Sequence, residues 1–328
     1  MKHLSSVIVA CLMAAPLVAC GGASNALSPA QQVHLPSNTS PCPCLYVANE
    51  GANTVTIYPV SAIGNVKPIQ TIGGTKTGLN APLDVALDAS GNIYVTNSQS
   101  NSLTVYASGA SGNVAPIQKI KGPDTGLRTP YGVAINAVDG NIYVANEAAN
   151  SVTIYAPGST GDAAPVATLA GRYTLLLSPT GLAFDASGDL WVASSYIALV
   201  LEFAPGSSGD TPYIGAVGGR HSKLTIPYAV ALDASSNVYV ANSNQVDHGT
   251  VIVFPAGGSG RDPMQRIIVG ASYYPDGIAV DGSRNIYAAV ASKDRILVYP
   301  SGSNGKVPAK ALKGARTGLV MPAGITIH

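Results

Sequence analysis

The sequence predicts an all-β fold, a six-bladed β-propeller with four antiparallel strands per blade, built from a repeat of about 48 residues. Three observations predict it: the composition, two evenly spaced residue columns, and complementary truncations at the two ends of the repeat array. The chain holds 36 Gly, 23 Pro and 16 Tyr among many Val, Ile and Thr. Such a composition is typical of many short strands joined by tight turns.

Two columns of residues keep the same period. An aromatic residue opens the motif Tyr-Val-Ala-Asn or a variant of it, and a proline precedes the next strand-like run. The aromatic column is Tyr46, Tyr94, Tyr143, Trp191, Tyr239 and Tyr287, and the proline column is Pro82, Pro130, Pro179, Pro227, Pro275 and Pro322. Because both columns advance by 47 to 49 residues at every step, the sequence contains six copies of one unit.

Each copy contains four strand-like runs, for instance 132–136, 141–145, 151–155 and 165–169. The first two runs are apolar nearly throughout, which is expected where both faces of a sheet are covered by neighbouring sheets. The fourth run often begins with proline and sometimes carries Lys, Arg or Gln, residues that blunt an exposed sheet edge. This run is therefore expected to be the outermost strand of each blade.

The two ends of the array predict how the ring closes. The first copy begins at a second strand, 45–48, and the last copy stops after a first strand, 324–327. Each end lacks what the other supplies, so we expect a composite blade of one C-terminal and three N-terminal strands. An open solenoid or a pair of three-blade sheets would leave these truncations unexplained.

The repeat also resembles a known family. The pattern Pro-x-Gly-[Ile/Val]-Ala-[Val/Ile/Leu]-Asp-x-x-Gly-Asn-[Ile/Leu]-Tyr-Val-Ala-Asn, followed by Asn-x-Val-x-[Ile/Val]-Tyr, is similar to NHL-repeat propellers over residues 45 to 328. The resemblance implies a binding platform, and six-bladed relatives include calcium-dependent lactonases of the gluconolactonase type. Those enzymes hold calcium over the axis with a glutamate, two asparagines and an aspartate. Here Glu50, Glu147 and Glu202 all lie away from the opening of a first strand, so that signature is absent.

The N-terminal segment has the features of a targeting signal. Lys2 and His3 precede an apolar run, and 17–21 (Leu-Val-Ala-Cys-Gly) resembles a bacterial lipobox, which implies cleavage after residue 19 and lipidation of Cys20. An ordinary signal peptide with an incidental cysteine is the alternative. We therefore expect a signal peptide at 1–19, a lipid-anchored flexible tether at 20–43 and the propeller at 44–328. The membrane would be a cell-envelope membrane, and Gly21 favours the outer membrane in a Gram-negative host.

Two further cysteines, Cys42 and Cys44, stand on either side of one proline at the end of this tether. An exported compartment permits a disulfide between them, although bridging a single intervening residue closes a strained ring. The same pair could instead remain as thiols. Metal binding is disfavoured, because no second pair of ligands accompanies them.

Charge excludes one class of partner. The formal net charge is +1, from 18 Lys and Arg against 17 Asp and Glu, so no basic stripe is available for phosphates and nucleic acid is not an expected partner.

Ligand-binding residues are expected on one face of the ring, called here the upper face. It is the face on which the connections from the fourth to the first strand, and from the second to the third strand, open. Residues at matched positions on this face differ between copies that are otherwise alike. Such variable positions are where a function specific to this protein would be encoded. The candidate ligand-binding residues are Asp84, Tyr131, Thr180, Tyr228, Asp276, His221, Arg316 and His248, the last from an insertion of three residues within 243–249.

These observations favour a non-enzymatic envelope lipoprotein that binds a glycan, a peptide or a protein through its upper face. No catalytic residue, metal ligand or cofactor is assigned. The alternative is a metal-dependent hydrolase, lactonase or lyase that uses calcium near Asp84 and Asp276, which are the two candidate axial carboxylates. Either aspartate could equally be a turn residue.

Overall fold

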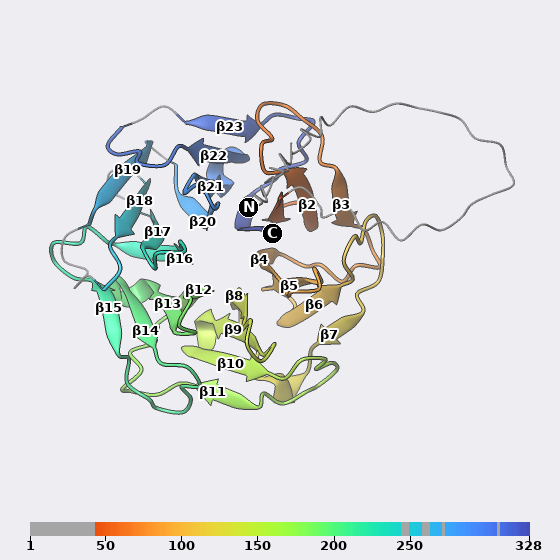
Figure 1. Ribbon diagram of the computed structural model, residues 1–328. Helices are drawn as coiled ribbons and strands as arrows, with labels where there is room; N and C mark the ends of the chain where they lie inside the picture. The colour runs from red at the N-terminus through yellow and green to blue at the C-terminus, as the bar shows by residue number, and fades with distance from the viewer. Residues whose placement is uncertain (1–42, 244–248, 258–262, 271–272, 307–308) are drawn as a thin grey trace, which may run out of the picture. The chain divides into compact units, whose positions relative to one another are not determined.

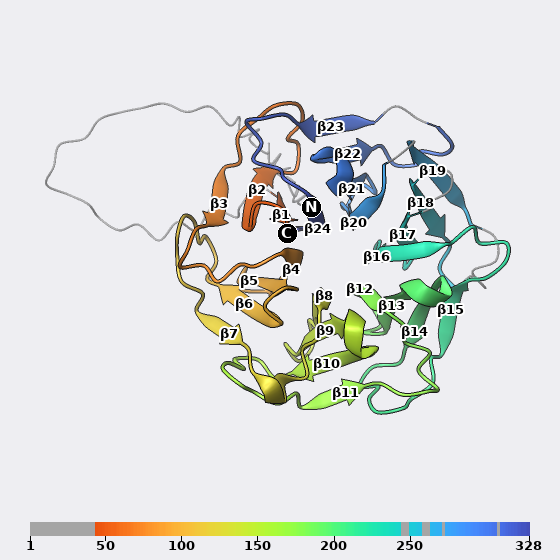
Figure 2. The same ribbon diagram turned by 180° about the vertical axis from the view of Figure 1, so that it is seen from behind.

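The computed structural model describes residues 43–243, 249–257, 263–270, 273–306 and 309–328. These residues form six four-stranded antiparallel sheets arranged in a ring, with the first strand of each blade nearest the axis (Figures 1 and 2). The six-bladed β-propeller expected from the repeat is therefore confirmed. None of the helices in these residues is long and apolar enough to cross a bilayer.

The blades are numbered from the composite blade onward. Blade 1 contains β24 (Pro322–Ile327), β1 (Cys44–Asn49), β2 (Thr54–Pro59) and β3 (Gln70–Gly73). Blade 2 contains β4 (Pro82–Leu87), β5 (Ile93–Asn97), β6 (Ser102–Tyr106) and β7 (Gln118–Ile120). Blade 3 contains β8 (Pro130–Ile135), β9 (Ile142–Asn146), β10 (Ser151–Tyr155) and β11 (Ala167–Leu169).

The second half of the ring repeats this arrangement. Blade 4 contains β12 (Pro179–Phe184), β13 (Leu190–Ser194), β14 (Leu199–Phe203) and β15 (Gly215–Gly218). Blade 5 contains β16 (Ile226–Leu232), β17 (Val238–Ser243), β18 (Gly249–Phe254) and β19 (Gln265–Gly270). Blade 6 contains β20 (Pro275–Val280), β21 (Ile286–Val290), β22 (Arg295–Tyr299) and β23 (Lys310–Lys313). The connections that the structure describes contain four short 3₁₀ helices: η1 (Pro123–Thr125), η2 (Glu147–Ala149), η3 (Ser195–Ile197) and η4 (Ala291–Lys293).

The ring closes through the composite blade, as expected. Strand β24 pairs antiparallel with β1, with Leu45 opposite Ile327 and Val47 opposite Ile325. Reciprocal backbone hydrogen bonds of 2.8 and 3.0 Å between Cys44 and His328 continue the pairing. Both edges that a linear array would leave open are thereby satisfied.

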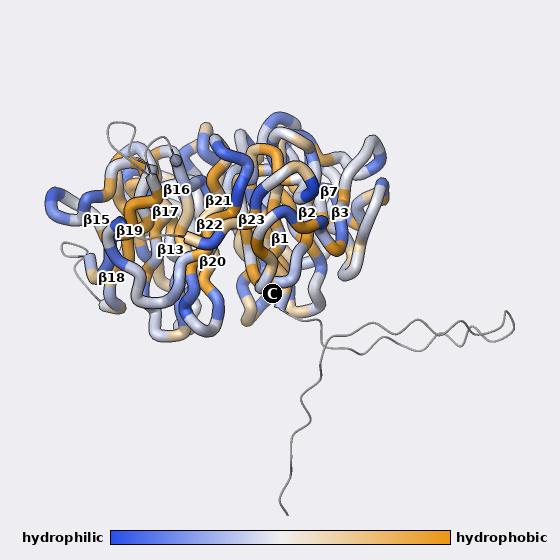
Figure 3. Tube along the Cα trace, turned by 90° about the horizontal axis from the view of Figure 1, so that it is seen from above, coloured by the Kyte–Doolittle hydropathy of each residue, from blue (hydrophilic) through white to orange (hydrophobic). Residues whose placement is uncertain are grey.

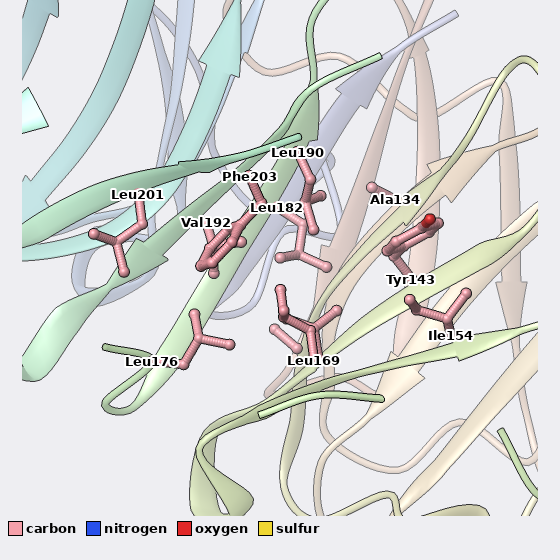
Figure 4. Close-up of a cluster of buried hydrophobic side chains, with 12 residues drawn as sticks. Ala134, Tyr143, Ile154, Leu169, Leu176, Leu182, Leu190, Val192, Leu201 and Phe203 are labelled. Atoms are coloured by element: carbon pink, nitrogen blue, oxygen red, sulfur yellow. The ribbon is translucent and has the colours of Figure 1, made fainter. Parts of the chain in front are cut away.

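The core lies between adjacent blades. Figure 4 shows one such interface, where Ile154 and Leu169 of blade 3 face Leu182 and Leu190 of blade 4. In Figure 3 the apolar segments follow the strands and the polar segments gather in the connections. Sheets that are covered on both faces explain why the inner strands are apolar nearly throughout.

The fourth strands are outermost, as expected, but shorter than the apolar runs suggest. Strand β7 begins at Gln118, two residues after Pro116, and β11 begins at Ala167, two residues after Pro165. A proline has no N–H to donate to the neighbouring third strand, so regular pairing begins only after it.

The repeated asparagines hold the upper connections in place. Asn97 donates to the Val95 carbonyl and to Thr104, and accepts from the Asn80 amide. A second column bridges neighbouring blades, since Asn53 accepts from the Ala81 amide at 2.7 Å. These residues are architectural, and they fix the loops around the mouth of the ring.

Candidate functional site

Two adjoining cavities lie at the axis of the ring. The first, the axial channel, has a volume of about 440 Å³ and is lined by residues from the first strands of all six blades. The second, the upper mouth, has a volume of about 500 Å³ and lies among connections of the upper face. Leu83, Tyr131 and Asp276 line both cavities, so these three side chains lie where the mouth and the channel adjoin. These are ordinary volumes for a small-ligand site.

Two tyrosines lie side by side near the axis: Tyr131 lines both cavities, and Tyr228 lines the channel. The rings of Tyr131 on β8 and Tyr228 on β16 are stacked, with centroids 6.1 Å apart and planes inclined by 26°. Thr180 occupies the matched position of the intervening blade 4, where it is fully buried and donates to the Pro227 carbonyl at 3.2 Å. A small residue at that position leaves room for the two rings to meet.

Neither tyrosine hydroxyl takes part in a hydrogen bond with the residues that the structure describes. Burial raises the pKa of Tyr131 well above its usual value, with smaller contributions from the nearby Asp276, Tyr228, Asp84 and Glu147. Both hydroxyls therefore stay protonated at neutral pH and can donate to a ligand.

Asp84 fills a position at which adjacent first strands normally approach closely. Glycine stands there in blades 1, 3, 4 and 6, and a Cβ added at Gly132 would lie only 2.3 Å from the Thr180 carbonyl oxygen. In blade 2 a carboxylate instead joins the two adjacent first strands, because the Val133 amide on β8 donates to Asp84 Oδ2 on β4 at 3.0 Å. Burial raises the pKa of Asp84 to about 7, against the opposing effect of backbone hydrogen bonds from Val133 and Val85.

Asp276 lies on the other side of the mouth, on β20. The Ala291 amide donates to its Oδ2 at 3.2 Å, whereas the matched amides of other blades donate to backbone carbonyls, as Ser98 does to Ala81. Burial raises the pKa of Asp276 to about 7; the hydrogen bond from Ala291 opposes this rise and the charge of Glu50 adds to it. Both axial aspartates therefore combine a structural hydrogen bond with a partly protonated carboxyl group at neutral pH.

The sequence did not single out two glutamates that act on this site. Glu50 lines the upper mouth, and the charge of Glu147 reaches both Tyr131 and Tyr228. Each follows the asparagine that ends a second strand, at a position occupied elsewhere by Ser or Ala. Variation at this column is the sequence signal for these glutamates, which follow second strands and not the openings of first strands.

The remaining candidates lie elsewhere. His221 and Arg316 are exposed on connections between blades, and neither lines the channel or the mouth. Most of the insertion at 243–249 is outside the described residues, as are His248, Cys42 and Cys20. Cys44 is buried at the start of β1.

Carboxylates close enough to share a metal ion were found, within the described part of the chain, only at Asp185, Asp189 and Glu202. This group lies by the turn between β12 and β13, on the face opposite the mouth. Asp185 there accepts hydrogen bonds from the Ser187 and Asp189 amides, as expected for a turn residue.

Comparisons with known proteins agree on the propeller architecture. Residues 38–168, less than half of the chain, match a family model described as a lactonase with a seven-bladed β-propeller, whereas the structure has six blades. No curated protein sequence matches the chain.

Solved structures resemble the fold over most of the chain. One from a nidogen/laminin complex is 14% identical, with a TM-score of 0.61, and the match covers 87% of this chain and 98% of that one. A protein of unknown function from Bacteroides caccae is 12% identical, with a TM-score of 0.59 and coverage of 88% and 99%. A streptogramin B lyase is 12% identical, with a TM-score of 0.56 and coverage of 84% and 81%. At such low identity these likenesses establish the fold alone: this chain is a six-bladed β-propeller.

Proposed function

We propose that this protein is a non-enzymatic binding propeller that holds a glycan, a peptide or a segment of a protein in the upper mouth. One observation carries the proposal: Tyr131 and Tyr228 form a stacked aromatic surface near the axis, with hydroxyls that no described residue engages. Aromatic faces combined with a few carboxylates suit sugars and peptides, since they supply apolar contact area together with directional hydrogen bonds.

The variation around the mouth supports this proposal. The residue after the proline column is Leu83, Tyr131, Thr180, Tyr228, Asp276 or Ala323, while the residues that build each blade repeat closely. A framework position is under the same packing demand in every blade, so its residue tends to recur. Five different residue types at six matched positions around one axis are expected of a surface shaped for an asymmetric ligand.

A hydrolase or lyase is the second candidate, and the two axial aspartates favour it. Carboxyl groups with a pKa of about 7 can act as general acid or base at neutral pH. Glu50 adds a third carboxylate at the mouth, where calcium could assist such chemistry. The partial match to a lactonase family also points in this direction.

We further propose that lipid on Cys20 anchors the protein to an envelope membrane. The chain enters the propeller at Cys44, which pairs with His328 on the face of the ring opposite the mouth. A tether over residues 20–43 would thus leave the mouth on the face away from its attachment point. Cys20→Ser should abolish fatty-acid labelling and leave uncleaved precursor, and equal labelling of this variant would refute the anchor.

The binding proposal is tested by titrating the purified full chain with a panel of tri- to hexapeptides and of chito- and manno-oligosaccharides. At least one class should bind with a Kd below about 1 mM, and mass spectrometry should recover the ligand unchanged. Failure of every member to bind would contradict the proposal. Conversion of a bound ligand, with or without added calcium, would establish the enzymatic candidate instead.

A further inference from the structure

The two axial cavities have an unusual charge composition for this chain. Glu50, Asp84, Asp276 and Asp294 line the upper mouth and the upper end of the channel. Among the described residues that line the two cavities there is no lysine, arginine or histidine. Because the whole chain has nearly equal numbers of acidic and basic residues, this one-sided lining is a local feature of the mouth.

Within the part of the chain that the structure describes, no basic side chain forms an ion pair with these carboxylates. Over the described ranges the ion pair found is Arg284 with Asp233, on the opposite face of the ring. Lys293 and Arg295 flank Asp294 in the sequence, and both pack against the ring of Tyr273. Lys293 Nζ lies 5.6 Å and Arg295 Cζ lies 5.2 Å from the centroid of that ring. Arg295 also donates to the Tyr273 hydroxyl at 3.1 Å, which fixes its side chain outside the mouth.

The aromatic pair completes a site for an organic cation. The faces of Tyr131 and Tyr228 are electron-rich, and a guanidinium or ammonium group within about 6 Å of such a ring is attracted to it. A guanidinium group also stacks flat on an aromatic ring while its N–H groups bind a carboxylate. The mouth offers both partners to the same group.

On this basis, and assuming the binding function proposed above, we propose that the ligand is a peptide segment that inserts an arginine side chain into the upper mouth. The guanidinium would stack on Tyr131 and bind the carboxylates of Glu50 and Asp276, which line the same cavity. Lysine would bind more weakly, because its ammonium group is more strongly hydrated and cannot stack as a plane.

Protonation of the aspartates gives this inference a pH signature. The titratable groups that line the mouth with Asp276 are Glu50, Tyr131, Tyr274 and Asp294, and Asp84 and Tyr228 line the adjoining channel. A cation binds the ionised carboxylate, and the pKa of Asp276 is about 7. Affinity for an arginine peptide should therefore rise between pH 6 and pH 8, while affinity for a neutral analogue should not.

The test compares acetyl-Gly-Gly-Arg-Gly-Gly-amide with the same peptide containing citrulline, a neutral isostere of arginine, by calorimetry on the full chain. The arginine peptide should bind about tenfold more tightly, and free ethylguanidinium should compete for the same site. Glu50→Gln should reduce the arginine-to-citrulline preference by about threefold or more. Asp124→Asn, which removes the same charge from an exposed outer loop, should leave the preference unchanged.

Three outcomes would overturn the inference. The first is equal affinity for the two peptides with loss of both in Tyr131→Ala, which would retain the mouth as a peptide site without cation selectivity. The second is binding of ethylguanidinium alone, which would retain the cation site and reject the peptide. The third is failure of both peptides to bind, after which the oligosaccharide arm of the panel still decides the proposed function. Melting temperatures of all variants establish that each one is folded.

Discussion

Asp276, at the upper mouth, lowers the stability of the fold as the pH rises. Its pKa is about 7 in the native state, against 3.8 in the unfolded chain. As the pH rises from about 4 to about 7, the unfolded carboxyl ionises while the native one largely does not, so native stability falls. Asp276→Asn keeps an oxygen for the Ala291 amide and removes this cost. We predict that the melting temperature of the variant exceeds that of the wild type at pH 8 and that this gain disappears near pH 4.

Asp88→Asn is the control for this prediction, because its effect on stability should have the opposite sign. Burial would raise the pKa of Asp88, but hydrogen bonds from Asn92, Tyr94 and Ser90 outweigh it and hold that pKa below its usual value. Asp88→Asn should therefore destabilise the fold at pH 7, with a loss that fades as the pH falls below about 4. A pH-independent difference for Asp276→Asn would show that its carboxyl titrates normally.

At Asp189, blade 4 departs from the residue type that recurs in other blades. Asn92, Asn237 and Asn285 stand at the matched positions, and each donates its amide to the aspartate of the preceding turn at 2.8 Å. Asp189 has no amide to donate, and burial together with the charge of Asp185 raises its pKa. Asp189→Asn is predicted to stabilise the protein by about 1 kcal/mol in urea unfolding. The reverse change, Asn237→Asp, should cost a similar amount, and a neutral or destabilising Asp189→Asn would contradict this explanation.

The axial position of a single residue is predictable where a column of the repeat fixes it. Comparing copies placed Asp84, Tyr131 and Asp276 at the axis, where the structure brings them together. The distance of a loop residue from the axis is not encoded in its register, so the copies could not reveal that His221 and Arg316 lie outside both cavities.

Among the elements, the connection that leads into blade 4 is locally strained. Leu175 has a φ of 53° and is 38% exposed, whereas the matched residues of blades 1, 2 and 3 are glycines with a φ of 72°. A left-handed backbone costs a residue with a side chain about 1–2 kcal/mol, and glycine avoids that cost.

Leu175→Gly is therefore predicted to raise the free energy of unfolding by about 1 kcal/mol. Gly126→Leu, which imposes the same strain on blade 3, is the matched control and should lower it. Chemical denaturation of both variants measures the two changes, and a destabilised Leu175→Gly would mean that the exposed leucine makes a stabilising contact.

Strand order and ring closure were predictable, because proline and aromatic columns mark the blades and the end copies are complementary. The exact start of the fourth strands was not, since an apolar run does not show where a proline interrupts the pairing. Cross-blade hydrogen bonds such as that from Val133 to Asp84 were also beyond prediction, because they join residues of different copies.

At the scale of the whole molecule, the stability of the ring depends on its last strand. Removal of 322–328 would expose β1, uncover two blade faces and remove Ala323 and Ile325, which are nearly fully buried. Burial of one isoleucine alone is worth about 1.5–3 kcal/mol. The truncated protein is predicted to melt about 10 °C or more below the full chain, or to lose its cooperative transition.

Removal of His328 alone is the control for that truncation. It deletes only the terminal hydrogen bonds to Cys44 and should shift the melting temperature by a few degrees at most. An unchanged melting temperature after removal of 322–328 would mean that the ring does not depend on this closure.

The central claim is that Tyr131 and Tyr228 form a ligand-binding surface and do not merely plug the channel. Both are only partly buried, and their hydroxyls make no hydrogen bond with described residues, so truncation should cost the core little. The most direct measurement takes affinity and melting temperature together on Tyr131→Ala and Tyr228→Ala, using the tightest-binding member of the peptide and oligosaccharide panel. We predict affinity losses of about tenfold or more, with melting temperatures within a few degrees of wild type. A destabilisation of about 3–5 kcal/mol with unchanged affinity in the folded fraction would identify the tyrosines as structural plugs and contradict the claim.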